Sequence, residues 1–429
     1  MKYLNVSLFL VISILLITGC QREETHEPVT LKVAGVDRDT FMELYGNAFL
    51  LENQDTTLEV IPNEFISDGE SMEEDIASYI TEHQPDVFIL GTYNFRPAVE
   101  TGLLLPLDTF MDTSEYEWSQ YPDSLLQRLR NDSGQDQLYG LSPFYTSSAL
   151  FYNKRLFDTY DVDYPRDHMS WEDVFALARK FPTQTENGER MYGFYHPDNM
   201  SIEEKLFRMI YNAGLGENLS FIDPLNGEVT LNTSSWNQLW HTFIQAYQDG
   251  IILDQPLNDL SDFSGTTPQE RVKGFIEGHA AMVVAETTVF ELANELEKLD
   301  VQVVQVPGTY QAQMQAGHTF AITSYSEHPD RAWEIIEFVH SEKAGLYHMV
   351  WGSLPIYSSQ LEQQWGLDLS AFYNKDAALY GIYSNKGLPE GFLQRYFEAG
   401  AAEMKLIMDE GKTIEMALDD LQEVMSAAY

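Results

Sequence analysis

The chain has 429 residues, 44% of them hydrophobic and 21% charged, which excludes a disordered protein and predicts more than one domain. It carries 67 acidic against 25 basic residues, a net charge of −42. A surface this negative repels phosphate backbones, so the composition argues against a nucleic-acid partner. Cys20 is the only cysteine, which excludes an internal disulfide and a thiolate metal site.

The N-terminus has the features of an export signal. Lys2 supplies a positive charge. Val6–Thr18 is a mostly apolar run, too short to span a bilayer but long enough for the hydrophobic core of a signal peptide. The run ends in Leu16-Ile17-Thr18-Gly19-Cys20, which resembles the lipobox of bacterial lipoproteins. That resemblance implies cleavage before Cys20 and a diacylated thiol on this residue. An ordinary signal peptide with a stray cysteine is the alternative.

We therefore expect residues 1–19 to be a lipoprotein signal peptide and residues 20–29 to be a polar tether. Two acyl chains on one cysteine suffice for stable anchoring. The expected location is the extracellular face of a bacterial cell membrane, reached through the lipid anchor.

The first part of the chain alternates strands with helices. Strands are expected at 30–36, 57–61 and 87–90, and helices at 41–51 and 72–83. This alternation predicts a mainly parallel sheet, whose ligands lie beyond the carboxyl ends of the strands. We expect 91–95 to be a loop, and five residues to face the ligand on this rule: Asp37, Arg38, Tyr93, Asn94 and Phe95.

Residues 138–154 are expected to connect two αβ regions. Tyr139-Gly140 and Pro143 are turn residues, and Ala149–Tyr152 is an apolar run of strand character. A strand that leaves one domain and enters the next is a natural hinge, and the crevice beside it is a natural ligand site.

Helices dominate the second part of the chain. Ser170 and Asp173 can form a capping box at the start of one helix, and Trp236 and Trp240, one turn apart in another, are expected in the core. The helices are expected from 171 and at 202–213, 234–249, 267–278, 329–340, 392–408 and 414–425, with strands at 280–285, 301–306 and 320–323.

Signatures of catalysis are missing from the sequence. It contains no phosphate-binding loop, dinucleotide fingerprint, zinc-protease helix or nucleophile elbow. Asp161-Val162-Asp163 hints at a calcium loop, but Pro165 and a missing glycine spoil it. We expect no catalytic residue, no metal and no cofactor, although a hydrolase that uses two carboxylates is an alternative from another class.

Four stretches, in this order and spacing, resemble the extracellular solute-binding proteins of ABC importers, the large sugar-binding type (family 1). They are Pro85-Asp86-Val87 with 102–108; Tyr139-Gly140 with 150–157 and 170–173; Phe275–Met282; and Ala316-Gly317 with 321–322 and 329–338. The resemblance covers nearly all of the chain after residue 30.

The resemblance implies an α/β fold of two lobes, each a mixed sheet flanked by helices, with the ligand cleft between them. Lobe 1 would hold 30–142 and 308–345, and lobe 2 would hold 144–306 and 350–429. Closure of the lobes on the ligand would signal to a membrane permease that the ligand is bound. The implied partners are a carbohydrate and ABC permease subunits, and we expect a monomer.

A sugar site needs an aromatic face for the ring and planar polar groups for the hydroxyls. Besides the five residues above, we expect contacts from Thr146, Glu286, Thr288, His318 and Trp351. The family usually has a glycine and then a stacking tryptophan at the positions of Glu286 and Thr288. This departure leaves open a non-sugar ligand, such as a cation, or a sensor lipoprotein on the same scaffold.

Overall fold

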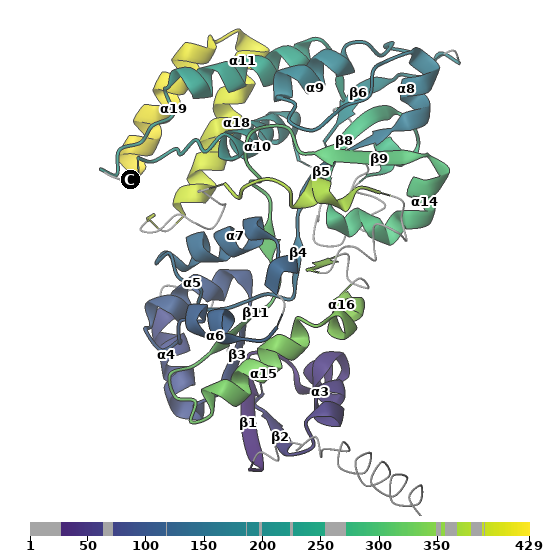
Figure 1. Cartoon of the computed structure of the whole chain (residues 1–429). Helices are drawn as coiled ribbons and strands as arrows, with labels where there is room; N and C mark the ends of the chain where they lie inside the picture. The colour runs from purple at the N-terminus through teal and green to yellow at the C-terminus, as the bar shows by residue number, and fades with distance from the viewer. Residues whose placement is uncertain are drawn as a thin grey trace, which may run out of the picture.

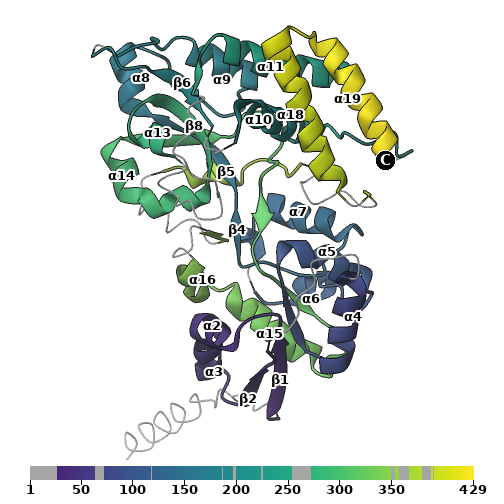
Figure 2. The same ribbon diagram turned by 180° about the vertical axis from the view of Figure 1, so that it is seen from behind.

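The computed structural model describes residues 27–62, 72–116, 118–185, 187–196, 200–223, 226–253, 272–348, 353–356, 367–378, 388–389 and 391–429. These residues form two α/β lobes, one above the other in Figure 1, with strand β4 (Phe144–Thr146) running between them. Figure 2 shows the same two bodies from behind. We call the lower body lobe 1 and the upper body lobe 2.

Lobe 1 is built on a four-stranded sheet of order β11-β3-β1-β2. Its strands are β1 (Val29–Ala34), β2 (Thr56–Val60), β3 (Val87–Leu90) and β11 (Thr319–Ile322). β1 pairs in parallel with β2 and β3, whereas β11 is antiparallel to β3. All four residues of β3 are buried, as expected for a central strand covered on both faces.

Lobe 2 is built on a five-stranded sheet of order β7-β6-β8-β5-β9. Its strands are β5 (Ser148–Asn153), β6 (Tyr192–Tyr195), β7 (Ile252–Leu253), β8 (Ala280–Glu286) and β9 (Val301–Gln305). β5 is antiparallel to both of its neighbours, and β6 is parallel to β7 and β8.

A three-stranded connector of order β10-β4-β12 lies between the two sheets. It adds β10 (Gln315–Ala316) and β12 (Leu354–Pro355) to β4, both antiparallel to it. Segments far apart in the chain therefore meet where the lobes join.

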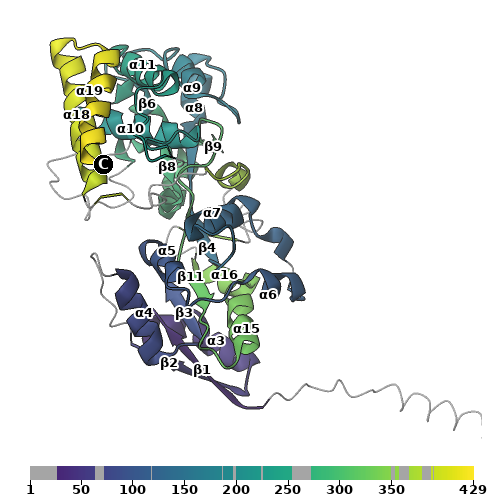
Figure 3. The same ribbon diagram turned by 90° about the vertical axis from the view of Figure 1, so that its left-hand side faces the viewer.

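Helices cover both sheets. In lobe 1 they are α2 (Arg38–Phe41), α3 (Asn47–Glu52), α4 (Met72–His83), α5 (Thr92–Glu100), α6 (Asp108–Thr113), α7 (Asp123–Ser133), α15 (Pro329–Val339) and α16 (Glu342–His348). In lobe 2 they are α8 (Lys154–Tyr160), α9 (Trp171–Ala178), α10 (Ile202–Gly216), α11 (Ser234–Gln248), α13 (Lys273–Ile276), α14 (Ala293–Lys298), α18 (Phe392–Glu410) and α19 (Ile414–Ala428). α18 and α19 pack side by side on the outside of lobe 2 (Figure 3).

Local signals in the sequence explain several of these helices. The capping box predicted at Ser170 and Asp173 is confirmed, since each side chain bonds the other residue's backbone N–H. Trp236 and Trp240 are 2% and 1% exposed and lie in the core, as predicted. Among the described residues, no helix combines the length and the apolar character that a membrane span requires.

The structure also differs from the prediction. The prediction of a loop at 91–95 is wrong, because α5 begins at Thr92 and Gly91 is its N-cap. The strand expected at 149–152 is part of β5, with the separate strand β4 just before it. Helix α7 was not predicted at all. The start of the helix expected at 267–278 lies outside the described residues, which show only α13 there.

Candidate functional site

The carboxyl ends of the parallel strands in lobe 1 point at the connector. Thr319 of β11 pairs with Leu90, the last residue of β3, and only two residues separate it from β10. Because β1 is parallel to β3, its end lies at the same edge. The segments after β1 and β3 therefore face lobe 2.

The sheet of lobe 2 has its corresponding edge at the same connector. One residue separates β4 from Ser148, the first residue of β5, which pairs with Glu286, the last residue of β8. β6 is parallel to β8, so its end also lies there. The carboxyl ends of strands from both lobes thus face one another across the connector, which is the position where open α/β sheets bind ligands.

The two predicted residues after β1 lie at this edge but already have local roles. Asp37 caps α2, since its Oδ1 accepts a hydrogen bond from Thr40 N at 2.9 Å. The bonds from Thr40 lower the pKa of Asp37, which keeps it ionised. The Arg38 guanidinium lies 3.4 Å from Asp39 Oδ1 and is largely exposed.

The predicted residues at the start of α5 divide into exposed and buried side chains. Tyr93 is 66% exposed on the first turn, whereas Phe95 is 3% exposed and packs in the core. Asn94 is half-buried. The helical turn explains the difference, because neighbouring residues on a helix point to different sides. The hydroxyl of Thr92 donates to Ala316 O at 3.1 Å and fixes this turn against β10.

Four further predicted residues lie at the junction of the lobes. Thr146 ends β4, where it pairs with β10 and is half-buried. Glu286 is exposed at the end of β8, and Thr288 is half-buried in the following 3₁₀ turn (Thr287–Leu292). His318 lies between β10 and β11, with its ring 6.0 Å from that of Phe144; its side chain reaches solvent, and partial desolvation by the surrounding protein lowers its pKa.

Cys20 and Trp351 lie outside the described residues. In the part of the chain that is described, no three His, Cys, Asp or Glu side chains are placed to hold a metal ion.

A buried amide that the sequence did not single out connects the segments that cross between the lobes. Gln311 lies between β9 and β10 and is 1% exposed. Its Nε2 donates to Ser147 Oγ and to the carbonyl oxygens of Ser148, at 2.9 Å, and Phe372, at 3.1 Å. Its backbone N–H donates to Asp376 O at 2.8 Å. One side chain thus joins the first crossover (146–148), the second (306–314) and the segment 367–378.

Lys375 adds a charge to the same junction. It is 8% exposed, and its ammonium donates to Val306 O at 2.6 Å and to Gly308 O. Burial lowers its pKa to about 8, against the opposing influence of Glu217 and Asp167. A lysine between two backbone carbonyls follows no sequence motif, so no pattern could have found it.

The comparison with protein families decides the identity of the fold. A family model described as bacterial extracellular solute-binding protein matches residues 34–346. The chain belongs to this family. Its members are generally binding proteins of the cell exterior or periplasm, not enzymes.

Solved structures of the family confirm the predicted two-lobe fold at low sequence identity. The sugar-binding protein MalE from the phytopathogen Xanthomonas citri is 17% identical, with a TM-score of 0.63 over 93% of this chain and 97% of that chain. A family 1 solute-binding protein from Alicyclobacillus acidocaldarius is 13% identical, with a TM-score of 0.67 over 94% and 99%. An ABC substrate-binding protein from Listeria monocytogenes, in complex with cycloalternan, is 17% identical, with a TM-score of 0.53 over 93% and 98%.

Proposed function

We propose that this solute-binding protein captures a carbohydrate, an oligosaccharide, between its lobes and delivers it to an ABC permease. The observation that carries the proposal is the meeting of strand ends from both lobes across the connector, where Tyr93, Glu286 and His318 lie. An exposed tyrosine ring suits the apolar face of a sugar, and carboxylate and imidazole groups suit its hydroxyls. The solved relatives from Xanthomonas and Listeria support a sugar.

The mechanism is binding by closure, without turnover. The crossovers at the connector would act as the hinge, between a lobe 1 of residues 30–142 with 308–345 and a lobe 2 of residues 144–306 with 350–429. Closure would bring the two sets of strand ends together around the sugar and create the surface that the permease recognises. The protein would act as a monomer, held on the outer face of the membrane by lipid on Cys20.

Thermal-shift screening with a panel of oligosaccharides, followed by titration calorimetry, tests the ligand class. At least one oligosaccharide should raise the melting temperature, and Tyr93→Ala should weaken its binding by about 1–3 kcal/mol if the ring stacks on the sugar. Leu51→Ala is the control, because Leu51 is also exposed, at 78%, but lies on α3. Hydrolysis of a chromogenic glycoside by the protein would contradict binding without turnover.

A cationic ligand is the second candidate, and the exposed carboxylate of Glu286 at the end of β8 favours it. Opposite charges across a binding site steer and select ligands. The same thermal-shift screen with spermidine separates the two candidates. If spermidine raised the melting temperature, this rise were lost in Glu286→Gln, and no sugar had an effect, the cationic ligand would become the first candidate and the carbohydrate the second.

The anchor has its own test. Cys20→Ala should abolish incorporation of labelled palmitate and release the protein from the membrane fraction of the cells that express it. A variant that is still lipidated and sedimented with membranes would contradict the lipobox interpretation.

A further inference from the structure

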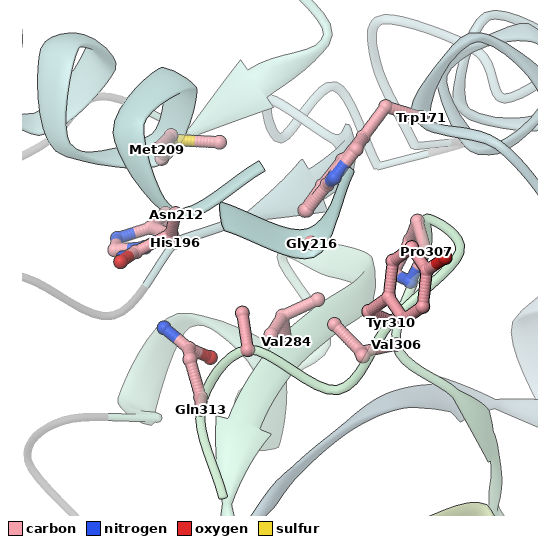
Figure 4. A pocket seen from close by; sticks show the side chains of 11 residues that line it. Trp171, His196, Met209, Asn212, Gly216, Val284, Val306, Pro307, Tyr310 and Gln313 are labelled. Carbon is pink, nitrogen blue, oxygen red and sulfur yellow. The ribbon is translucent and has the colours of Figure 1, made fainter. Parts of the chain in front are cut away.

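A small pocket lies in lobe 2 where the second crossover passes over the edge of the sheet. Its volume is about 30 Å³. In Figure 4, Asn212 and His196 lie on one side, Trp171 on another, and Tyr310 and Gln313 on the crossover beneath. Its walls therefore come from the sheet edge, from helices α9 and α10 and from the second crossover.

The pocket belongs to the edge of lobe 2 that faces lobe 1. His196 directly follows β6, Val284 lies two residues before the end of β8, and Val306 directly follows β9. β9 ends opposite Ala149, near the start of β5. These are the strand ends at which the proposed carbohydrate binds.

The crossover wall of the pocket is fixed to lobe 2 by backbone hydrogen bonds. Gly216 O, at the end of α10, accepts from Thr309 N at 3.1 Å and from Tyr310 N at 2.8 Å. Gly308 N donates to Met169 O at 3.1 Å. The pocket is therefore preformed in this structure and needs no movement of the crossover to exist.

A buried donor and a buried acceptor among the pocket residues lack a hydrogen-bond partner in the described part of the chain. Trp171 is 7% exposed, and neither its Nε1 nor Asn212 Oδ1 has a hydrogen-bond partner among the described residues, although both atoms are buried. Buried polar groups are nearly always hydrogen-bonded, so each such exception needs an explanation. One atom is a donor and the other an acceptor, and a hydroxyl group can accept from the first kind and donate to the second.

The charges around the pocket favour an uncharged group. No carboxylate lines it. Burial, with a smaller contribution from the nearby Lys205, lowers the pKa of His196 to about 3, so the imidazole is neutral at ordinary pH. Most of the remaining lining residues are apolar, among them Val284 and Val306, and Gln313 adds an uncharged amide. Its volume matches one water molecule or one hydroxyl.

We propose that this pocket is a subsite that receives one hydroxyl group of the bound carbohydrate, with Trp171 Nε1 as donor and Asn212 Oδ1 as acceptor. The inference rests on the proposed function, because it assigns part of the same site. The subsite would give the specificity a physical basis. A sugar that lacks this hydroxyl would leave both buried atoms unpaired, and a site built to hydrogen-bond a hydroxyl strongly rejects analogues without it.

Titration calorimetry on the full chain tests the subsite, with maltotetraose as the first probe and then whichever oligosaccharide binds the wild type most tightly. Asn212→Leu keeps the size of the side chain and removes the acceptor, so the Kd should rise about tenfold or more. Gln238→Leu, an exposed amide on α11, is the matched control and should leave the Kd unchanged.

A second measurement leaves the wild-type pocket intact. Trp171→Phe identifies the indole N–H resonance of Trp171 in a proton–nitrogen NMR spectrum. In the wild-type protein this resonance should shift when the sugar is added, because the N–H gains an acceptor. This readout serves even if the Asn212 variant does not fold.

The outcomes are distinguishable. A wild type that binds sugar, with an unchanged Kd in a folded Asn212→Leu and an unmoved Trp171 resonance at saturation, overturns the subsite and leaves the proposed function standing; the pocket then holds only an ordered water. A wild type that binds no sugar overturns the proposed function and the subsite with it.

Discussion

At the scale of single residues, the junction of the lobes depends on buried polar side chains. Gln311 donates to three acceptors, on two other segments of the chain. The stretch 311–315 reads Gln-Ala-Gln-Met-Gln, and its pattern does not tell which glutamine is buried. That property depends on partners more than 60 residues away, so it could not be predicted from the sequence.

Replacing Gln311 by leucine should lower the free energy of unfolding by about 1–3 kcal/mol, because it leaves the Ser148 and Phe372 carbonyls without this donor. Urea denaturation followed by circular dichroism measures the change. Gln394→Leu, on the exposed face of α18, is the control and should change stability by less than about 0.5 kcal/mol. Equal effects of the two substitutions would contradict the role of Gln311.

Lys375 should give the stability a pH dependence. Its pKa is lowered by burial to about 8 in the folded protein, below the ordinary value of 10.5. Between these values the unfolded chain binds more protons than the folded one, so stability rises with pH through this window. Below pH 8 both states are protonated, and the cost of burying the charge is fully present.

Urea denaturation from pH 7 to 10.5 should therefore show the wild type gaining about 2 kcal/mol relative to Lys375→Met, which has no titrating group there. The comparison with the variant cancels the titration of other lysines and tyrosines. A constant difference between the two proteins across the window would contradict a depressed pKa.

At the scale of elements, α7 holds the segment 373–378 by its backbone. Ser124 Oγ donates to Tyr373 O at 2.9 Å, Gln127 Oε1 accepts from Ala377 N at 2.9 Å, and Arg128 Nη2 donates to Ala378 O at 3.1 Å. The three side chains follow the spacing of one helix face. This helix of lobe 1 thus holds a segment that also contacts the second crossover.

Removing the cation from this contact should be costly. Arg128 is 3% exposed and lies 3.4 Å from Asp132. Burial raises the pKa of Asp132, and the positive charge of Arg128 opposes this rise. Arg128→Met leaves the half-buried carboxylate of Asp132 with the weaker influence of Arg96 and should lower the free energy of unfolding by about 3 kcal/mol in urea denaturation. Arg130→Met, on the same helix, removes a partly exposed pair with Asp108 and should cost less than about 1 kcal/mol. If Arg128→Met destabilised the protein no more than Arg130→Met, the role of Arg128 in holding the segment 373–378 would be contradicted.

Elements with strong local signals were predicted, and elements without them were not. α9 has a capping box, and α19 has apolar residues at helical spacing, which are buried in the structure. α5 begins at a glycine without a side-chain cap, so its first turn reads as a loop. Only three of the 11 residues of α7 are apolar, which hides its periodicity. The misplacement of Phe95 in the site follows from the missed helix.

At the scale of the whole molecule, the order of motifs along the chain predicted the two-lobe fold, which the family relatives confirm. The site was less predictable. The rule of carboxyl strand ends predicts Asp37 and Tyr93 between the lobes, and the family resemblance adds Glu286, but the sequence does not tell which side chains are committed to caps, core or ligand. The pocket beside Trp171 comes from four distant segments and has no sequence signal.

Closure of the lobes on a sugar is the central claim, and small-angle X-ray scattering tests it most directly. The full chain, measured with and without a saturating oligosaccharide identified by calorimetry, should show a smaller radius of gyration when the sugar is bound, since the two bodies approach each other. Identical scattering curves for the free and the fully bound protein would contradict the account.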